Sequence, residues 1–137
     1  MIIGLMTLTA AAVATHTVQI DHHGTPVQAV YSARADVTSR TIGAHTPNRM
    51  DSRRCLWQAT IHVDRKLENS AALARTVSSD KVLKGSQAGN CQSNGKAIEL
   101  ELARHDDSIR DHMLAIAEQD RAPLLAEIDS VRSFASN

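Results

Sequence analysis

Apolar and polar residues alternate with a period of two through the first half of the chain, and this pattern constrains the fold most strongly. Across residues 27–38 the apolar side chains share one face, with Val30 as the exception. The same alternation returns across residues 55–64, with Leu56 as the exception. Alternation of this kind predicts strands with one buried and one solvated face. A sheet built from them has one apolar face, which another layer must cover.

A shorter alternating segment precedes these strands, because Val18 and Ile20 share a face within residues 16–21. Residues 22–26 read His-His-Gly-Thr-Pro, and Gly and Pro in such a segment are typical of a turn. The sequence therefore predicts a hairpin that becomes, with residues 55–64, a three-stranded antiparallel meander. Residues 39–53 contain Gly43 and Pro47 and are predicted to be a connection.

The second half carries helical patterns that would supply the covering layer. Residues 96–119 predict one long helix with an apolar stripe at helical spacing, formed by Ile98, Leu102, Ile109, Met113 and Ile116. Asp120 and Pro123 predict that another helix begins there, with Asp120 as its N-cap. The apolar face of this second helix is Leu124, Leu125, Ile128, Val131 and Phe134.

Between the third strand and the long helix the patterns are weaker. Asn69 or Ser70 is predicted to cap a short helix that ends at Thr76. Residues 78–95 are polar and predict a connection, with one helical turn at residues 81–84. The expected fold class is therefore α+β: a three-stranded antiparallel meander followed by helices packed on one face, with one disulfide.

The disulfide is expected between Cys55 and Cys91, the two cysteines of the chain. Cys55 falls on the core face of the third strand, and Cys91 precedes the long helix, so a bridge would join the helical layer to the sheet. An even cysteine count in an exported chain favours this pairing, whereas a cytosolic chain would hold two buried thiols. No Cys-x-x-Cys spacing suggests a cysteine metal site.

Export is predicted from residues 1–14, which read MIIGLMTLTAAAVA. This segment is apolar and uncharged, and it ends in the small-x-small pattern of a signal peptidase site. It is shorter than the roughly 20 residues that span a bilayer. We therefore expect a signal peptide over residues 1–14 and a single exported domain over residues 15–137, periplasmic or secreted, without a membrane span after cleavage. The basic leader of a signal peptide is missing, so a buried N-terminal segment of a cytosolic domain is the alternative.

Composition narrows the function classes. The formal net charge is zero, which argues against a nucleic-acid binder. The aromatic side chains are Tyr31, Trp57 and Phe134, too few for a stacking platform. Residues 15–95 hold 10 Lys or Arg against 6 Asp or Glu, and residues 96–137 hold 5 against 9. These basic and acidic parts are expected to attract each other within the fold.

Seven histidines are the most distinctive chemistry of the chain. His22 and His23 lie in the predicted turn, where His16 or Asp21 could complete a metal site. Adjacent residues in a strand point to opposite faces, however, which opposes a joint site there.

His105 and His112 are seven residues apart and share a face of the predicted long helix. With the nearby Asp106, Asp107 and Asp111 they could form a metal or acid–base site. No known metal-binding spacing supports this site, and local hydrogen bonding at the edge of the core is the simpler interpretation.

No catalytic, cofactor or phosphate-binding motif is present. The leading hypothesis is therefore a non-enzymatic envelope protein that binds another component, either an envelope protein or an anionic surface. Arg40, Arg49, Arg53 and Arg54 make the 40–54 connection basic, which suits an anionic surface such as a lipid or polysaccharide, and a solvated loop is the simpler interpretation. A periplasmic metal-binding protein that uses histidines is the alternative, and a small hydrolase is the second alternative.

Overall fold

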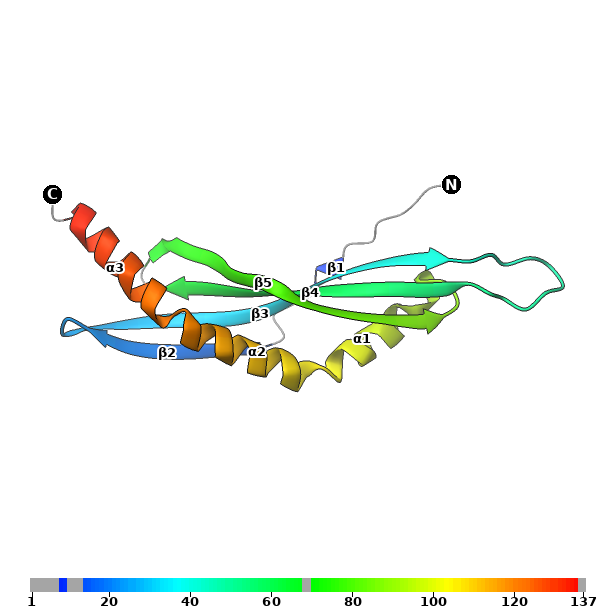
Figure 1. The fold of residues 1–137 in the computed structure, drawn as a ribbon, viewed down its shortest axis with the longest axis horizontal. Helices are drawn as coiled ribbons and strands as arrows, with labels where there is room; N and C mark the ends of the chain where they lie inside the picture. The colour runs from blue at the N-terminus through cyan, green and yellow to red at the C-terminus, as the bar shows by residue number, and fades with distance from the viewer. Residues whose placement is uncertain (1–7, 10–13, 68–69, 136–137) are drawn as a thin grey trace.

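The computed structural model describes residues 8–9, 14–67 and 70–135. Within them an antiparallel sheet is followed by helices (Figure 1). The strands are β1 (Leu8–Thr9), β2 (Ala14–His22), β3 (Thr25–Ile42), β4 (Arg54–Leu67) and β5 (Ser70–Ala88). A 3-10 turn, η1 (Gln92–Asn94), leads into α1 (Gly95–Ala103), α2 (Asp106–Gln119) and α3 (Arg121–Ala135). The α+β class is confirmed.

The four long strands form a meander in which each strand pairs antiparallel with the next. β1 adds to β3 beyond the end of β2, with Leu8 opposite Val37. β3 and β5 contain 18 and 19 residues, and at about 3.3 Å per residue each is roughly 60 Å long. These strands give the molecule its elongated shape (Figure 1).

The first hairpin and its turn are confirmed. His23 and Gly24 connect β2 to β3 with φ values of 54° and 77°. Two successive positive φ values are typical of a type I′ turn, whose twist matches that of the flanking strands. The predicted connection is shorter than residues 39–53, because β3 continues to Ile42 before the loop begins.

The meander has four strands, so the prediction of three is wrong. Residues 70–76, predicted to be helical, and residues 81–84, predicted to form a helical turn, belong to β5. The pairing of β4 with β5 shifts register between Ile61 and Leu67, and such bulges interrupt the alternation of side chains. β5 is also an edge strand that places Val77 and Leu83 only partly in the core. Its sequence therefore lacks the period that identified the other strands.

The predicted long helix is two helices, because α1 ends at Ala103 and α2 begins at Asp106. The intervening chain makes a tight turn in which His105 N–H donates to the Leu102 carbonyl at 3.0 Å. α3 begins at Arg121 as predicted. Asp120 directly precedes α3, and its carboxylate accepts hydrogen bonds from Tyr31 and Arg65.

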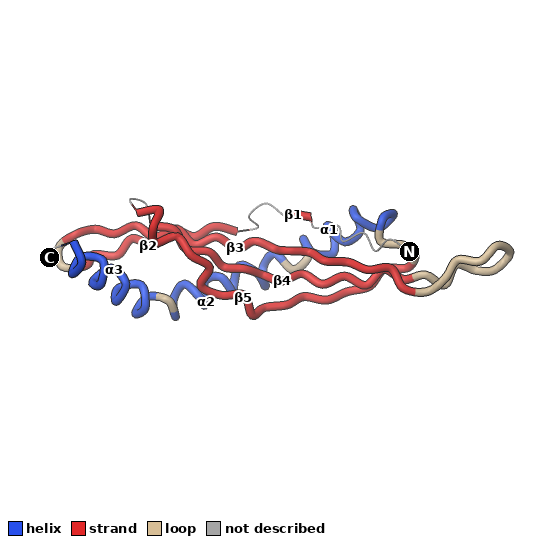
Figure 2. The backbone as a smooth tube through the Cα atoms, turned by 90° about the horizontal axis from the view of Figure 1, so that it is seen from above, coloured by secondary structure: helices blue, strands red, loops and turns tan. Residues whose placement is uncertain are grey.

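The helices follow one another along one face of the sheet (Figure 2), and α2 contacts all four long strands. Two core clusters lie beneath them. The larger packs α2 and α3 against β2, β3 and β4, where Ala29, Ala33 and Ala35 are fully buried and let α2 approach closely. The smaller joins Trp57 to Ile98 of α1.

The disulfide between Cys55 and Cys91 is confirmed, with the two Cα atoms 4.8 Å apart. It ties the start of β4 to the segment that enters the helical layer. Within the described chain, no helix covers the opposite face of the sheet (Figure 2), which we call the open face. No described helix is both long and apolar enough to cross a membrane.

Candidate functional site

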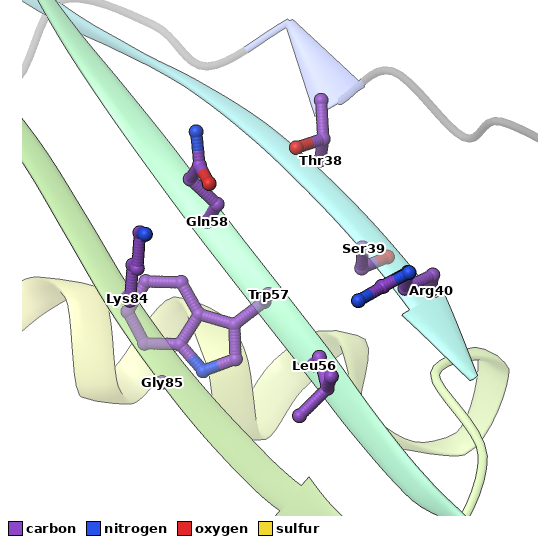
Figure 3. A pocket seen from close by; sticks show the side chains of 8 residues that line it. All are labelled: Thr38, Ser39, Arg40, Leu56, Trp57, Gln58, Lys84 and Gly85. Atoms are coloured by element: carbon purple, nitrogen blue, oxygen red, sulfur yellow. The ribbon is translucent and has the colours of Figure 1, made fainter. Parts of the chain in front are cut away.

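A hollow of about 380 Å³ lies where the open face approaches the β3–β4 loop (Figure 3). Three adjacent strands line it: Thr38, Ser39 and Arg40 of β3, Leu56, Trp57 and Gln58 of β4, and Lys84 and Gly85 of β5. Trp57 of β4 is paired with Gly85 of β5, and its indole lies against the glycine. A Cβ at Gly85 would lie 2.4 Å from Trp57 Cε2. A side chain at this position would collide with the indole, so only glycine fits. The contact between Trp57 and the Gly85 backbone forms the floor of the hollow.

Two cations, Arg40 and Lys84, flank the hollow, and none of its lining residues is acidic. Neither cation forms an ion pair within the described part of the chain. Nearby, the Arg54 guanidinium donates to Ser86 Oγ at 2.8 Å and forms no ion pair among the described residues. This end of the open face therefore presents uncompensated positive charge.

The β3–β4 loop does not cancel that charge. Its acidic residue, Asp51, accepts hydrogen bonds from the Arg53 side chain and backbone, and these lower the pKa of Asp51 to about 2. Asp51 and Arg53 therefore neutralise each other, while Arg49 in the same loop is exposed. The loop as a whole remains basic, as the sequence predicted for this region.

Large apolar side chains are exposed at the same end. Ile42 and Val82 are each 41% exposed, and Met50 in the β3–β4 loop is 93% exposed. Mixed apolar and arginine-rich surfaces are typical of protein interfaces. We call this region the hairpin-end surface; it comprises Thr38, Arg40, Ile42, Arg54, Leu56, Gln58, Val82 and Lys84.

Further along the open face, the charges are paired. Arg34 donates to Asp64 at 2.8 Å and to Asp36 at 3.0 Å. Thr76 of β5 donates to Asp64 at 2.6 Å. Partial burial alone would raise the pKa of Asp64, but its hydrogen bonds from Thr76 and Arg34 hold the pKa below its usual value. The charged side chains of this region pair with one another, so the region is not a free charged surface.

His62 lies beside this network, on the open face of the sheet. Its Nε2 is 2.9 Å from Asp36 Oδ2, and its Nδ1 is 2.8 Å from Ser79 Oγ. Serine, histidine and aspartate are thus arranged in the order of a hydrolase triad. Sequence reasoning did not single out these residues, because they come from three strands and have no motif spacing.

The structure brings His22 and His23 together despite their adjacency. The turn places their ring centroids 4.1 Å apart. Asp129 of α3 joins them, and the three residues form the one group of possible metal ligands found within the described residues. His16 and Asp21, the predicted additional ligands, do not belong to this group. Asp129 was missed because it lies more than a hundred positions along the chain.

His105 and His112 do not form part of a ligand group in the described residues. His105 is the residue before α2. His112 packs between α2 and β5, with its Nε2 3.8 Å from Asp80 Oδ1. Burial first, and then the nearby Lys81 charge, lower the pKa of His112. The helix therefore uses His112 as a neutral packing residue.

A buried charged cluster that the sequence did not predict lies beneath the junction of α2 and α3. Arg65 is fully buried and donates to Asp120 at 2.6 Å and to Glu127. The Tyr31 hydroxyl donates to the same Asp120 carboxylate at 2.7 Å. Arg75 also donates to Glu127. This cluster anchors the helices to the sheet.

Comparison with known proteins yields no family for the chain. No protein-family model, curated protein or solved structure matches it. The geometry of the sites described above is therefore the basis on which a function is proposed.

Proposed function

We propose that this protein is an exported, non-enzymatic binding module that holds an acidic partner protein on its hairpin-end surface. The observation that carries the proposal is two cations, Arg40 and Lys84, on either side of a hollow in the open face, neither with an ion-pair partner among the described residues. Cations without internal partners contribute little to folding. They are available to pair with carboxylates of another molecule and to steer its approach.

The chemistry of the surface favours a protein over other anionic partners. A nucleic-acid surface needs several aromatic rings or a broad basic field, and this chain has a net charge of zero. Exposed Ile42, Met50 and Val82 offer apolar contacts that a polysaccharide or a lipid headgroup would not use. Acidic residues on the partner would complement Arg40, Arg54 and Lys84.

Export is part of the proposal, and the disulfide supports it because such bonds persist mainly in oxidising compartments. Most of the predicted signal, residues 1–7 and 10–13, lies outside the described residues. The described part of the signal, β1 (Leu8–Thr9), pairs with β3 and would be lost on cleavage. β2 begins at Ala14, so cleavage after Ala14 would keep that strand almost whole. Mass spectrometry of protein from the periplasm should find Thr15 as the first residue and no free thiol. An intact Met1 with two free thiols would contradict export.

Binding is tested with three defined probes: an oligoglutamate peptide carrying leucines, vesicles of an anionic phospholipid, and an anionic polysaccharide. We expect the peptide to bind best at low salt and to be released as salt rises, because its contacts are partly electrostatic. Binding to the vesicles or the polysaccharide without binding to the peptide would contradict a protein partner.

A second candidate function, a small hydrolase, has one observation in its favour, the contact of His62 with Ser79 and Asp36. In a hydrolase, Ser79 would be the nucleophile, His62 the base and Asp36 the group that orients the base. Asp36 is also engaged by Arg34, and the hollow is lined by other residues. Hydrolysis of p-nitrophenyl acetate that falls to background in Ser79→Ala would support this function, and equal rates in both proteins would exclude it.

A further inference from the structure

The turn between β2 and β3 gives two histidines an unusual arrangement. His23 occupies the first central position with a φ of 54°, where type I′ turns usually have asparagine, aspartate or glycine. The turn bends the chain so that the two imidazoles meet, with their planes inclined at 56°. The rule that neighbouring strand residues point to opposite faces therefore does not apply here.

α3 brings a carboxylate to the same place. His22 Nε2 is 2.7 Å from Asp129 Oδ1, and His23 Nε2 is 3.6 Å from the same oxygen. The ligand atoms of the three residues all lie within 4.8 Å of one another. The His22 side chain is 13% exposed, whereas those of His23 and Asp129 are 69% and 52% exposed. The His22 side chain is thus held by packing, whereas the side chains of His23 and Asp129 are exposed.

These distances are close to those of a zinc site. Zinc binds histidine nitrogen and carboxylate oxygen at about 2.0–2.2 Å, usually in a tetrahedron. Bonds of that length place neighbouring ligand atoms roughly 3.3 Å apart. The observed 2.7 and 3.6 Å bracket this separation. The ligand nitrogens of the two histidines lie within 4.8 Å of each other, and rotation of the exposed His23 side chain would adjust their separation. Two imidazoles and one carboxylate leave the fourth position to water.

We propose that His22, His23 and Asp129 bind one Zn²⁺ ion, which fastens α3 to the β2–β3 turn. This site lies at the other end of the sheet from the hairpin-end surface (Figure 1), and it is independent of the proposed function. The simpler explanation is a local hydrogen bond between His22 and Asp129. His23 distinguishes a zinc site from this hydrogen bond, because zinc binding needs His23 and the hydrogen bond between His22 and Asp129 does not.

The test is calorimetric titration of the full folded chain with ZnCl₂, with MgCl₂ as the control for a cation that prefers oxygen ligands. We expect one Zn²⁺ per chain at micromolar concentration and no heat from Mg²⁺. Zinc at a hundredfold excess over its dissociation constant should raise the melting temperature by roughly 5–10 °C.

Three variants identify the ligands. His23→Ala and Asp129→Asn should each weaken zinc binding at least tenfold, while the matched control His45→Ala should leave it unchanged. His45 is a fair control because it also lies near a carboxylate, with its Nδ1 3.8 Å from Asp51 Oδ2. His23→Ala leaves the His22–Asp129 hydrogen bond in place, so the variant should fold as the parent does.

A structural readout complements the titration. Zinc should slow amide hydrogen exchange in the turns of α3 around Asp129 in the parent and have no such effect in His23→Ala. Absence of zinc binding at micromolar concentration would overturn the proposal. Equal zinc affinity in the parent and His23→Ala would also overturn it, because the site would then not include His23.

Discussion

Arg65 and Arg40 lie on opposite faces of the same sheet, and their surroundings differ in every respect. The Arg65 side chain is fully buried beneath the helices and paired with Asp120 and Glu127. Arg40 is exposed on the open face and has no ion-pair partner within the described chain. A buried charge must be paired for the fold to survive, whereas an exposed unpaired one is available to a partner. The comparison separates the arginines that hold this protein together from those that can serve its function.

Arg34 is intermediate between these two. It is paired with Asp64 and Asp36, as Arg65 is paired with its carboxylates, but its side chain is 39% exposed. Water and salt screen such a pair, so its net contribution to stability is small. If burial rather than pairing decides how much an arginine contributes to stability, its removal should cost most at Arg65, little at Arg34 and nothing measurable at Arg40.

The largest effect is expected at Arg65. Arg65→Ala would leave Asp120 and Glu127 without their buried cation, and breaking a buried pair typically costs about 3–5 kcal/mol. Urea denaturation should show the loss as a lower midpoint. Asp120→Asn should be less harmful, because the amide oxygen still accepts hydrogen bonds. A cost of less than about 1 kcal/mol for Arg65→Ala, the range of an exposed pair, would remove the distinction between the two faces.

The next effect is expected at Tyr31. Tyr31→Phe removes one hydrogen bond to the buried Asp120 carboxylate and should cost about 1–3 kcal/mol near neutral pH. Arg65 still pairs with Asp120 in this variant, so the loss should remain below that of Arg65→Ala. Equal losses in the two variants would contradict this order and show that the hydroxyl matters to the cluster as much as the guanidinium.

The same variant has a signature at alkaline pH. Burial, and then the hydrogen bond to Asp120, raise the pKa of Tyr31 well above its usual value. A group whose pKa is higher in the folded state stabilises the fold below its unfolded pKa, about 10 for tyrosine, and loses that contribution as the pH rises further. From about pH 9 to pH 11, the parent should therefore lose more stability than Tyr31→Phe. Parallel curves for the two proteins would contradict this assignment.

A small effect is expected at Arg34. Arg34→Ala should change the free energy of unfolding by at most about 1 kcal/mol, and the difference from the parent should shrink further in high salt. The measurement is urea denaturation at low and high ionic strength. A salt-independent loss of several kcal/mol would show that the open face is shielded from water, for example by self-association.

Much of the fold could be predicted from local pattern, and the exceptions have physical causes. The strand over residues 55–64 was recognised by its alternation, and Cys55 lies on its core face as expected. The predicted strand ended at residue 64, one residue before Arg65. Arg65 lies on the same core face, but it is charged. Hydrophobic alternation cannot identify a buried cation, because the carboxylates that neutralise it belong to another part of the chain.

The sites show the same limit. The basic character of the 40–54 connection was visible in the sequence, because its arginines are close together in the chain. The hollow was not visible in the sequence, because it depends on the pairing of β4 with β5. The bulges and the edge position of β5 hid this strand from prediction. Ser79 of β5 was missed for the same reason, whereas Asp129 of α3 was missed because it lies more than a hundred positions from His22 and His23. Ion pairs such as Arg65–Glu127 do join the basic and acidic parts, as the charge distribution suggested.

The most direct test of the account measures folding and binding on one variant, Arg40→Glu combined with Lys84→Glu. Neither side chain has an internal ion-pair partner among the described residues, so the urea midpoint should match that of the parent, while oligoglutamate binding should fall at least tenfold. Lys66→Glu, a matched exposed charge reversal at the other end of the open face, should keep both properties. Retained binding in the double variant, or equal loss in Lys66→Glu, would contradict the assignment of the hairpin-end surface as the binding site.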